Sequence, residues 1–407
     1  MEDFEMMTNA MQPQVLVNTG SGIAMALPGA SSKSPSLILA RATPDERVKT
    51  WMRHQPFWGS IYTPQEYVGR EERLLTCRLS RDGGLTNWIL TQDANSTTTT
   101  TRPILSSMET YRKRAIVRDT TGTVRDVTAH GVATVFTSQH HRRKGYSSKM
   151  LSLLGDTLAQ QQSREQGSAE FSILFSDIGK TFYAQNQWMP FPSTHLSFPV
   201  SPFTTKHDAS LTPITNDNLP MVAELDEHVL RNKSAAPPAP PNTVRVAILP
   251  DLATYEWHFA REAILSSHLL GKVPSIHGAL YTPAGLPGSR VWMLWSPSVS
   301  GGRQDPGKNV MNILHFAIED DAIPDDDLAN AFESIMGLAH TQAREWLCPK
   351  IDMWNPDDRT QNLARHIVNL RSELVVRETS CIASLRWFGE GSVSGVEWVD
   401  NQKFEWC

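Results

Sequence analysis

The chain has 407 residues, of which 40% are hydrophobic and 20% charged, and this composition fits a globular protein long enough for two domains. Its formal net charge of −5 argues against a protein that binds nucleic acid through general positive charge. No apolar run reaches the length of a transmembrane helix, so we expect neither nucleic acid nor a membrane as a partner.

The N-terminus and the cysteines favour a protein of the reducing cytoplasm. Residues 1–36 are polar and small, which is typical of a flexible tail, and they lack the apolar core of a secretory signal. The cysteines are widely spaced and form no C-x-x-C pair; they are Cys77, Cys348, Cys381 and Cys407. We therefore expect reduced thiols, a cytoplasmic location and no metal site.

The first ordered elements are expected to be a strand and two helices. Residues 36–42 are mostly aliphatic, as in a strand. Thr43-Pro44-Asp45-Glu46 has the N-cap, the first-position proline and the acidic first turn of a helix, and residues 63–66 repeat that signal. The runs Leu74–Leu79 and Asn87–Gln92 are predicted to form paired strands.

The most informative stretch is a strand, a basic turn and a helix. Residues 132–137 are β-branched, aromatic and small, with no breaker among them. A polar turn at residues 138–141 precedes the run Arg142-Arg143-Lys144-Gly145-Tyr146-Ser147. The helix that follows has an apolar face made by Met150, Leu151, Leu153, Leu154 and Leu158.

This turn has the properties of an anion site. The first N–H groups of a helix have no internal acceptor, and the helix dipole adds positive charge there. Gly145 allows a ligand to approach the backbone, Ser147 is small, and three cations stand beside them. A phosphate or pyrophosphate suits this geometry. The residues alone also allow an ordinary strand–helix junction with a solvated basic turn.

The rest of the first domain is predicted as strand, helix and strand. Residues 171–175 form a buried strand, and Asp177 begins a helix that holds Tyr183 and Trp188. The run His195–Val200 is expected to close this domain as its last strand. We place the first domain at residues 37–202 and a linker region with one helix at residues 203–243.

A second pattern fills residues 244–407. Residues 290–295 and 309–318 are predicted strands, residues 325–346 a long helix, and residues 350–354 another strand. This strand–helix–strand order repeats the order of the first domain without its basic glycine-containing turn.

The central motif resembles that of a known family. Arg142-x-x-Gly145-x-Ser147, directly after Val135-Phe136-Thr137, resembles the acyl-CoA motif of the GNAT N-acetyltransferases, although Arg143 stands where glycine is frequent. The resemblance implies an α/β (α+β) GNAT fold with a splayed mixed sheet, followed by a second, degenerate GNAT-like domain. It also implies that acetyl-CoA binds at Phe136, Thr137, Arg142, Arg143, Lys144, Gly145, Tyr146 and Ser147.

Further strings narrow the resemblance to the fungal lysine N6-acetyltransferases of lysine degradation. They are Leu105–Thr110, Thr137–Tyr146, Leu174–Gly179, Phe182-Tyr183, Trp354-Asn355-Pro356 and Trp406-Cys407. The resemblance implies acetyl transfer from acetyl-CoA to the N6 amine of free L-lysine, a small-molecule partner. Another small amine, a protein lysine, or CoA binding without catalysis are the alternatives. The sequence does not indicate an oligomeric state.

The resemblance also suggests catalytic residues. Tyr183 matches the tyrosine that protonates the leaving thiolate in GNAT enzymes. The general base is either His130, with a reference pKa of about 6.5, or Glu109. Asp177 would hold the ammonium group of the substrate, or would only cap the helix that follows it. Each position has a structural alternative, such as packing on a helix face.

The end of the chain is expected to be docked, because loose tails are polar and this one ends in large aromatic residues. The resemblance implies that the second domain covers the acceptor side of the first. The carboxylate of Cys407, or Glu405, would then attract an ammonium group. The alternative is that Trp406 only pins the tail to its own domain.

Overall fold

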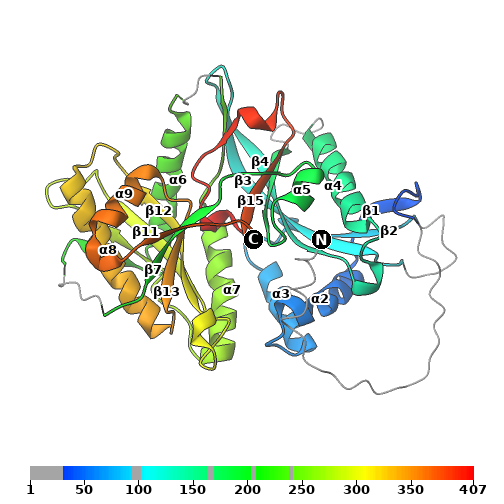
Figure 1. The fold of residues 1–407 in the computed structure, drawn as a ribbon, viewed down its shortest axis with the longest axis horizontal. Helices are drawn as coiled ribbons and strands as arrows, with labels where there is room; N and C mark the ends of the chain where they lie inside the picture. Colours follow the sequence, from blue (N-terminus) through cyan, green and yellow to red (C-terminus); the bar gives the residue numbers. More distant parts are fainter. Residues whose placement is uncertain (1–30, 94–101, 163–168, 203–207, 238–241) are drawn as a thin grey trace.

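The computed structural model describes residues 31–93, 102–162, 169–202, 208–237 and 242–407, which form two sheets side by side with helices around and between them (Figure 1). Residues 1–30 of the predicted N-terminal tail lie outside the described residues. In the described ranges, no helix is both long and apolar enough to cross a membrane.

Nine strands of the described chain form the first sheet. They are β1 (Leu37–Arg41), β2 (Leu85–Gln92), β3 (Ser106–Arg118), β4 (Val124–Phe136), β5 (Ala169–Ser176), β6 (Met189–Pro190), β9 (Val244–Ile248), β15 (Ile382–Trp387) and β16 (Val396–Trp398). The order is β1-β2-β3-β4-β5-β15-β6, with β9 beside β3 and β16 beside β9. β4 and β5 are parallel, as are β9 and β16, so the sheet is mixed.

The second sheet is also mixed. Its strands are β7 (Thr194–Pro199), β8 (Leu211–Ile214), β10 (Gly278–Tyr281), β11 (Val291–Ser298), β12 (Val310–Ile318), β13 (Lys350–Trp354) and β14 (Glu373–Val376). They follow the order β14-β7-β13-β12-β11-β10-β8, in which β12 and β13 are parallel. The mixed α/β architecture predicted from the sequence is confirmed.

Both predicted helix starts near the N-terminus are confirmed. Helix α2 (Pro44–Trp58) begins with a capping box, in which Thr43 Oγ1 accepts from the N–H of Glu46 and Glu46 Oε2 accepts from the N–H of Thr43. Helix α3 (Pro64–Leu75) begins in the same way. The predicted strand Leu74–Leu79 is wrong, because α3 continues through its first residues and buries Leu74 on the helix face of Tyr67.

Three further helices cover and connect the sheets. Helix α4 (Tyr146–Gln162) buries the predicted apolar residues Met150 and Leu154 against one face of the first sheet. Helices α6 (Leu219–Ala235) and α7 (Leu252–Leu270) lie between the sheets, where Tyr255 of α7 shares one apolar cluster with Ala115 of β3 and Trp292 of β11. The region predicted as a linker therefore contributes α6 to a core that both sheets share.

The two sheets exchange strands, which the sequence did not indicate. The run His195–Val200 was predicted to close the first sheet, and this is wrong: β7 pairs with β13 and β14 in the second sheet. The position beside β5 is taken instead by β15, which comes from the C-terminal part of the chain. The choice between sheets depends on pairing with distant strands, which the local sequences of β7 and β15 do not specify.

A wedge opens between the parallel strands of each sheet. β4 and β5 are paired from Thr128–Ala169 to Val132–Leu174, but β4 continues to Phe136. Likewise β12 and β13 are paired only as far as Ile313–Met353, and β12 continues to Ile318. In each sheet a long helix connects the two strands: α4 in the first and α8 (Asp325–Glu345) in the second. The splayed sheet and the second, GNAT-like unit that the resemblance implied are thus present.

Candidate active site

The basic turn after β4 has the backbone shape of an anion site. A short 3-10 helix at Gln139–His141 follows β4, and α4 begins at Tyr146. Between them, Arg143 and Gly145 have φ of 59° and 78°. When residues with left-handed backbone conformation alternate with residues of negative φ, successive N–H groups point toward one place. The N-terminus of α4 adds its dipole there. Arg143, at the position where the GNAT motif often has glycine, thus adopts a glycine-like conformation.

Hydroxyl groups join this turn to the ends of the strands. Thr137 Oγ1 lies 2.6 Å from Ser147 Oγ and 2.8 Å from Ser106 Oγ. Arg142 Nε donates to the carbonyl of Thr137 at 3.1 Å. The predicted positions Thr137, Arg142 and Ser147 therefore meet in one place, where these contacts join the turn to the end of β4.

The other predicted CoA-binding positions differ in how they face the turn. The guanidinium of Arg142 lies over the ring of Phe57, and the Phe136 ring packs beside the same ring. Lys144 is exposed, whereas the side chain of Tyr146 is buried in the core under α4. Phe136 and Tyr146 can therefore serve a ligand through their backbone groups, and the two arginines and Lys144 through charge.

One residue at this turn was missed by sequence reasoning. A Cβ placed on Gly145 would lie 2.8 Å from Ser32 Oγ, so the segment before β1 rests on the turn. Ser32 belongs to the region predicted as a tail, and nothing in its sequence signals this contact. A side chain at position 145 would clash with this segment, and its residue would be strained at the positive φ of the turn.

The strand that leads into the turn carries a bulge. The register between β3 and β4 shifts between Ser107–Phe136 and Glu109–Ala133, and Thr134 within the shift has φ of 50°. A bulge re-aims backbone groups away from the regular ladder. β5 no longer pairs with β4 here, so an N–H group of the bulge that points into the wedge could polarise a carbonyl group.

Glu109 lies directly behind the bulge and has the properties of a general base. It is 4% exposed, and its Oε1 accepts from Trp51 Nε1 at 3.0 Å and from Asn87 Nδ2 at 2.6 Å. Burial raises its pKa to about 7, and the carboxylate of Glu71 adds to this rise. Trp51 and Asn87 had no signal in the sequence, because they join Glu109 from two separate elements.

His130, the other candidate base, is on the opposite face of the sheet. It pairs with Arg112, whereas its neighbour Gly131 pairs with Tyr111 on the face of Glu109. Burial and the Arg112 charge lower the pKa of His130 to about 4. His130 and Glu109 are therefore not brought together, and His130 is a weak base at neutral pH.

Tyr183 lies on the α4 side of the wedge. It is on the short helix α5 (Thr181–Gln185) and packs in the cluster that contains Val132 and Leu174, the last paired residues of β4 and β5. Burial raises the pKa of its phenol, so the side chain keeps its proton at neutral pH. The Tyr183 phenol thus lies on one face of the sheet at the wedge, and the Glu109 carboxyl lies on the other face.

Asp177 follows β5 and is exposed. Its Oδ1 accepts from the N–H of Cys381 at 3.0 Å, just before β15 begins. It does not cap α5, whose N-cap residue is Lys180. Asp177 therefore ties the exchanged strand to the end of β5.

The C-terminal tail is docked on the face of the sheet that carries Glu109. Trp406 and Cys407 pack with Tyr111 of β3 and Trp257 of α7. The thiol of Cys407 is so close to the central strand that a Cβ on Gly131 would lie 2.7 Å from it. Figure 1 marks the C-terminus where the two sheets meet. The tail therefore reaches the first domain rather than staying on its own.

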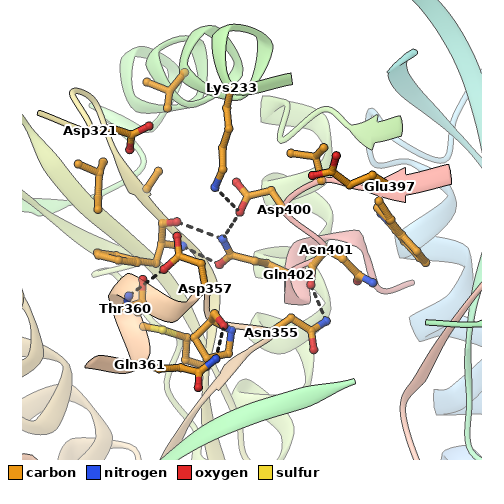
Figure 2. Close-up of a pocket in the computed structure, with 18 of the residues that line it drawn as sticks. Lys233, Asp321, Asn355, Asp357, Thr360, Gln361, Glu397, Asp400, Asn401 and Gln402 are labelled. Atoms are coloured by element: carbon orange, nitrogen blue, oxygen red, sulfur yellow. Dashed lines mark hydrogen bonds and ion pairs between the residues drawn. The ribbon is translucent and has the colours of Figure 1, made fainter. Parts of the chain in front are cut away.

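A cavity of about 670 Å³ lies in the second sheet, in the wedge between β12 and β13 (Figure 2). Gln402 fills part of it, because it accepts from the N–H of Phe316 at 3.0 Å and donates to the carbonyl of Phe316 at 3.1 Å. The helix that follows β12 starts with Asp325, Asp326 and Asp327. These carboxylates at the helix N-terminus would repel a phosphate, so this wedge does not repeat the anion site of the first.

The tail is anchored beneath this cavity. His315 is buried and lies 2.9 Å from Asp226 on α6 and 3.0 Å from Asp400. Burial would lower the pKa of His315, but the two carboxylates raise it to about 10. Lys233 also pairs with Asp400 at 3.3 Å (Figure 2). Charged His315 therefore holds together α6, β12 and the start of the tail.

Comparisons with known proteins agree with this architecture. The family described as "LYC1 GNAT-like C-terminal domain" matches residues 195–407. A protein named lysine acetyltransferase, from Yarrowia lipolytica (strain CLIB 122 / E 150), is 23% identical over 290 residues, which are 62% of this chain and 70% of that protein.

A crystal structure of a conserved protein of unknown function from Enterococcus faecalis V583, described as a probable N-acyltransferase, matches with a TM-score of 0.51 and 11% identity. The match covers 86% of this chain and 72% of that one, and it supports the fold. The predicted resemblance to GNAT proteins is confirmed. Since the family match covers more than half of the residues, the chain belongs to the LYC1 GNAT-like family.

Proposed function

We propose that this GNAT-type protein is an N-acetyltransferase that moves the acetyl group of acetyl-CoA to the N6 amine of free L-lysine. One observation carries the proposal: a buried carboxyl group with a pKa of about 7, Glu109, lies directly behind a bulged strand that ends in an anion-binding turn. This arrangement provides a base, a polarising backbone and a phosphate site along a single strand.

The turn would hold the phosphates of acetyl-CoA. Its backbone N–H groups and the N-terminus of α4 face an anion, and Arg142, Arg143 and Lys144 add positive charge. The rest of the substrate would then extend into the wedge between β4 and β5. There, N–H groups of the bulge at Thr134 would stabilise the negative charge that develops on the carbonyl oxygen.

Glu109 and Tyr183 would move the protons. A primary amine has a pKa of about 10 and must lose a proton before it attacks, and Glu109 accepts that proton. The amine nitrogen then bonds to the carbonyl carbon and releases its second proton to solvent water, and the bond from this carbon to sulfur breaks. Tyr183 donates its phenolic proton to the departing thiolate and later regains a proton from water. We favour Glu109 over His130 because His130 faces the other side of the sheet.

The docked tail favours a small acceptor. Trp406 and Cys407 cover part of the sheet face that carries Glu109, which leaves less room for a folded protein substrate. The name of the Yarrowia lipolytica relative supports lysine as the acceptor. The alternatives are another small amine, a protein lysine, or CoA binding without catalysis.

A test is to incubate the protein with acetyl-CoA and a panel of acceptors, and to measure the released CoA thiol and the mass of the product. The panel holds lysine, other amino acids and lysine-containing peptides, and Tyr183→Phe serves as the control for enzymatic release. We expect turnover with free lysine and little with peptides. Turnover with peptides alone would refute the small-acceptor proposal, and binding of acetyl-CoA without turnover would indicate a non-catalytic protein.

A further inference from the structure

Cations from several elements gather around two indole rings, one on β13 and one on the tail. Arg377 and Lys403 both lie over the ring of Trp354, each 4.0 Å from the ring centroid. Lys403 also lies 4.4 Å from the centroid of Trp406, and Arg261 lies over that same ring. Three positive side chains are therefore gathered around two rings at the junction of the sheets.

The cations of this group differ in their partners. Arg261 pairs with Glu262, whereas Lys403 makes cation–π contacts and no ion pair with any described residue. Arg377 is 8% exposed, and within the described part of the chain its Nε and Nη1 have no acceptor. Its Nη2 makes a long contact of 3.4 Å with Asn355 Oδ1. Among the described residues, these two buried or partly buried cations thus have no carboxylate partner.

Such an arrangement is costly without an anion. A buried cation that lacks an acceptor loses its hydration without compensation, and two like charges on one ring repel each other. Burial lowers the pKa of Arg377 to about 10 and that of Lys403 to about 8, which shows that the protein disfavours their charges as they stand. Asp177, whose charge acts on Lys403, is exposed and already accepts from Cys381, and Asp352, whose charge acts on Arg377, is paired with Lys350.

We propose that Arg377 and Lys403 bind the carboxylate of the acceptor, so that the substrate class is a free amino acid with a second amine on its side chain. This inference rests on the proposed function and deepens it. The ring of Trp354 would hold both cations in place, and the carboxylate would supply the acceptors that Arg377 lacks.

The position of this group relative to Glu109 fits such a substrate. Lys403 and Cys407 are separated by four residues of tail, which span at most ~14 Å when fully extended. Cys407 lies beside Gly131, on the sheet face of Glu109. At one end of this region Glu109 would face an amine of the substrate. At the other end Arg377 and Lys403 would face a carboxylate of the substrate. A diamino acid has the matching charges at its two ends.

The test compares lysine with cadaverine, which is lysine with hydrogen in place of the carboxylate. We expect wild-type protein to prefer lysine in kcat/KM. Arg377→Gln and Lys403→Gln should each lower kcat/KM for lysine by about 10- to 100-fold, the value of a hydrogen bond to a charged group. Neither variant should change kcat/KM for cadaverine or KM for acetyl-CoA. The exposed Arg303→Gln is the control and should change none of these.

Other outcomes would overturn the inference. An equal loss for lysine and cadaverine would show a structural role, and a higher KM for acetyl-CoA alone would show a site for CoA phosphate. Because Arg377 is buried, Lys403→Gln, at a partly exposed position, provides the second variant if Arg377→Gln does not fold. Calorimetry with lysine alone decides the inference separately from catalysis. If lysine does not bind, or binds equally to wild type and Lys403→Gln, the inference fails even where acetyl transfer is observed.

Discussion

Replacing Glu109 with glutamine should separate activity from stability. Glutamine has nearly the same size and keeps an oxygen that can accept from Trp51 and Asn87, but it cannot take a proton from an amine. General base catalysis contributes about 10²–10⁴ in rate, so kcat should fall by that factor. Binding of acetyl-CoA should be unchanged, because the turn that would hold its phosphates is formed by other residues.

The stability of this variant should change in the opposite direction. Burial raises the pKa of Glu109 from 4.5 to about 7, so the ionised carboxylate costs the folded state on the order of 3 kcal/mol above pH 7. The contribution of Glu109 to stability is most favourable below pH 4.5 and is lost as the pH rises through about 7. Glutamine does not ionise, so Glu109→Gln should be more stable than wild type at about pH 8.

The assay is steady-state release of CoA thiol between about pH 5 and about pH 9, with urea unfolding at both ends of this range. Wild-type kcat/KM should rise through about pH 7, because the base must be deprotonated. This rise should disappear in Glu109→Gln and persist in His130→Gln, the matched control from the other face of the strand. A Glu109→Gln enzyme with wild-type turnover and the same rise would refute the assignment.

Three further predictions concern the turn, the acid and the anchor of the tail. Gly145→Asp should abolish acetyl-CoA binding in calorimetry, because it puts a side chain and a negative charge into the anion site at a φ of 78°; unchanged affinity would contradict the placement of the cofactor. Tyr183→Phe should lower kcat by about 10²–10⁴ with acetyl-CoA affinity intact, and wild-type turnover where chemistry limits the rate would rule out its role as acid. His315→Gln should cost about 3–5 kcal/mol at neutral pH in urea unfolding, because it leaves Asp226 and Asp400 without their shared cation. The pKa of His315 is raised, so its contribution is complete below about pH 6.5 and is lost as the pH rises through about 10. A deficit that does not shrink at high pH would mean that packing, and not charge, explains the loss.

Local signals predicted local structure well. The start signals at Thr43 and Thr63 gave two helices because capping depends on residues within one turn. The strand–turn–helix at residues 132–158 was predicted for the same reason, since its glycine and its basic residues are neighbours in sequence. Leu74–Leu79 failed because a short apolar run fits a helix end as well as a strand, and α3 ends within it, at Leu75.

Contacts between distant segments could not be predicted in this way. Trp51, Asn87 and Glu109 come from three elements, and no spacing in the sequence shows that they share hydrogen bonds. In the sequence Arg377 and Lys403 are ordinary basic residues, and only the fold shows that both lie over the ring of Trp354. Candidate site residues were therefore found where the motif is continuous and missed where the fold assembles them.

The exchange of strands between the sheets has a consequence for the order in which this chain folds. β5 ends at Ser176, but its neighbour β15 begins at Ile382, so the first sheet stays open at that position until the distant segment has been synthesised. In many proteins of several domains the N-terminal domain folds first on the ribosome. Here we expect the edge of β5 to stay unpaired until nearly the whole chain has been synthesised. Closing so long a loop is slow, and an unpaired edge invites aggregation. Ribosome-bound chains that end before β15 should therefore remain sensitive to protease, whereas chains that include it should gain resistance in both sheets together.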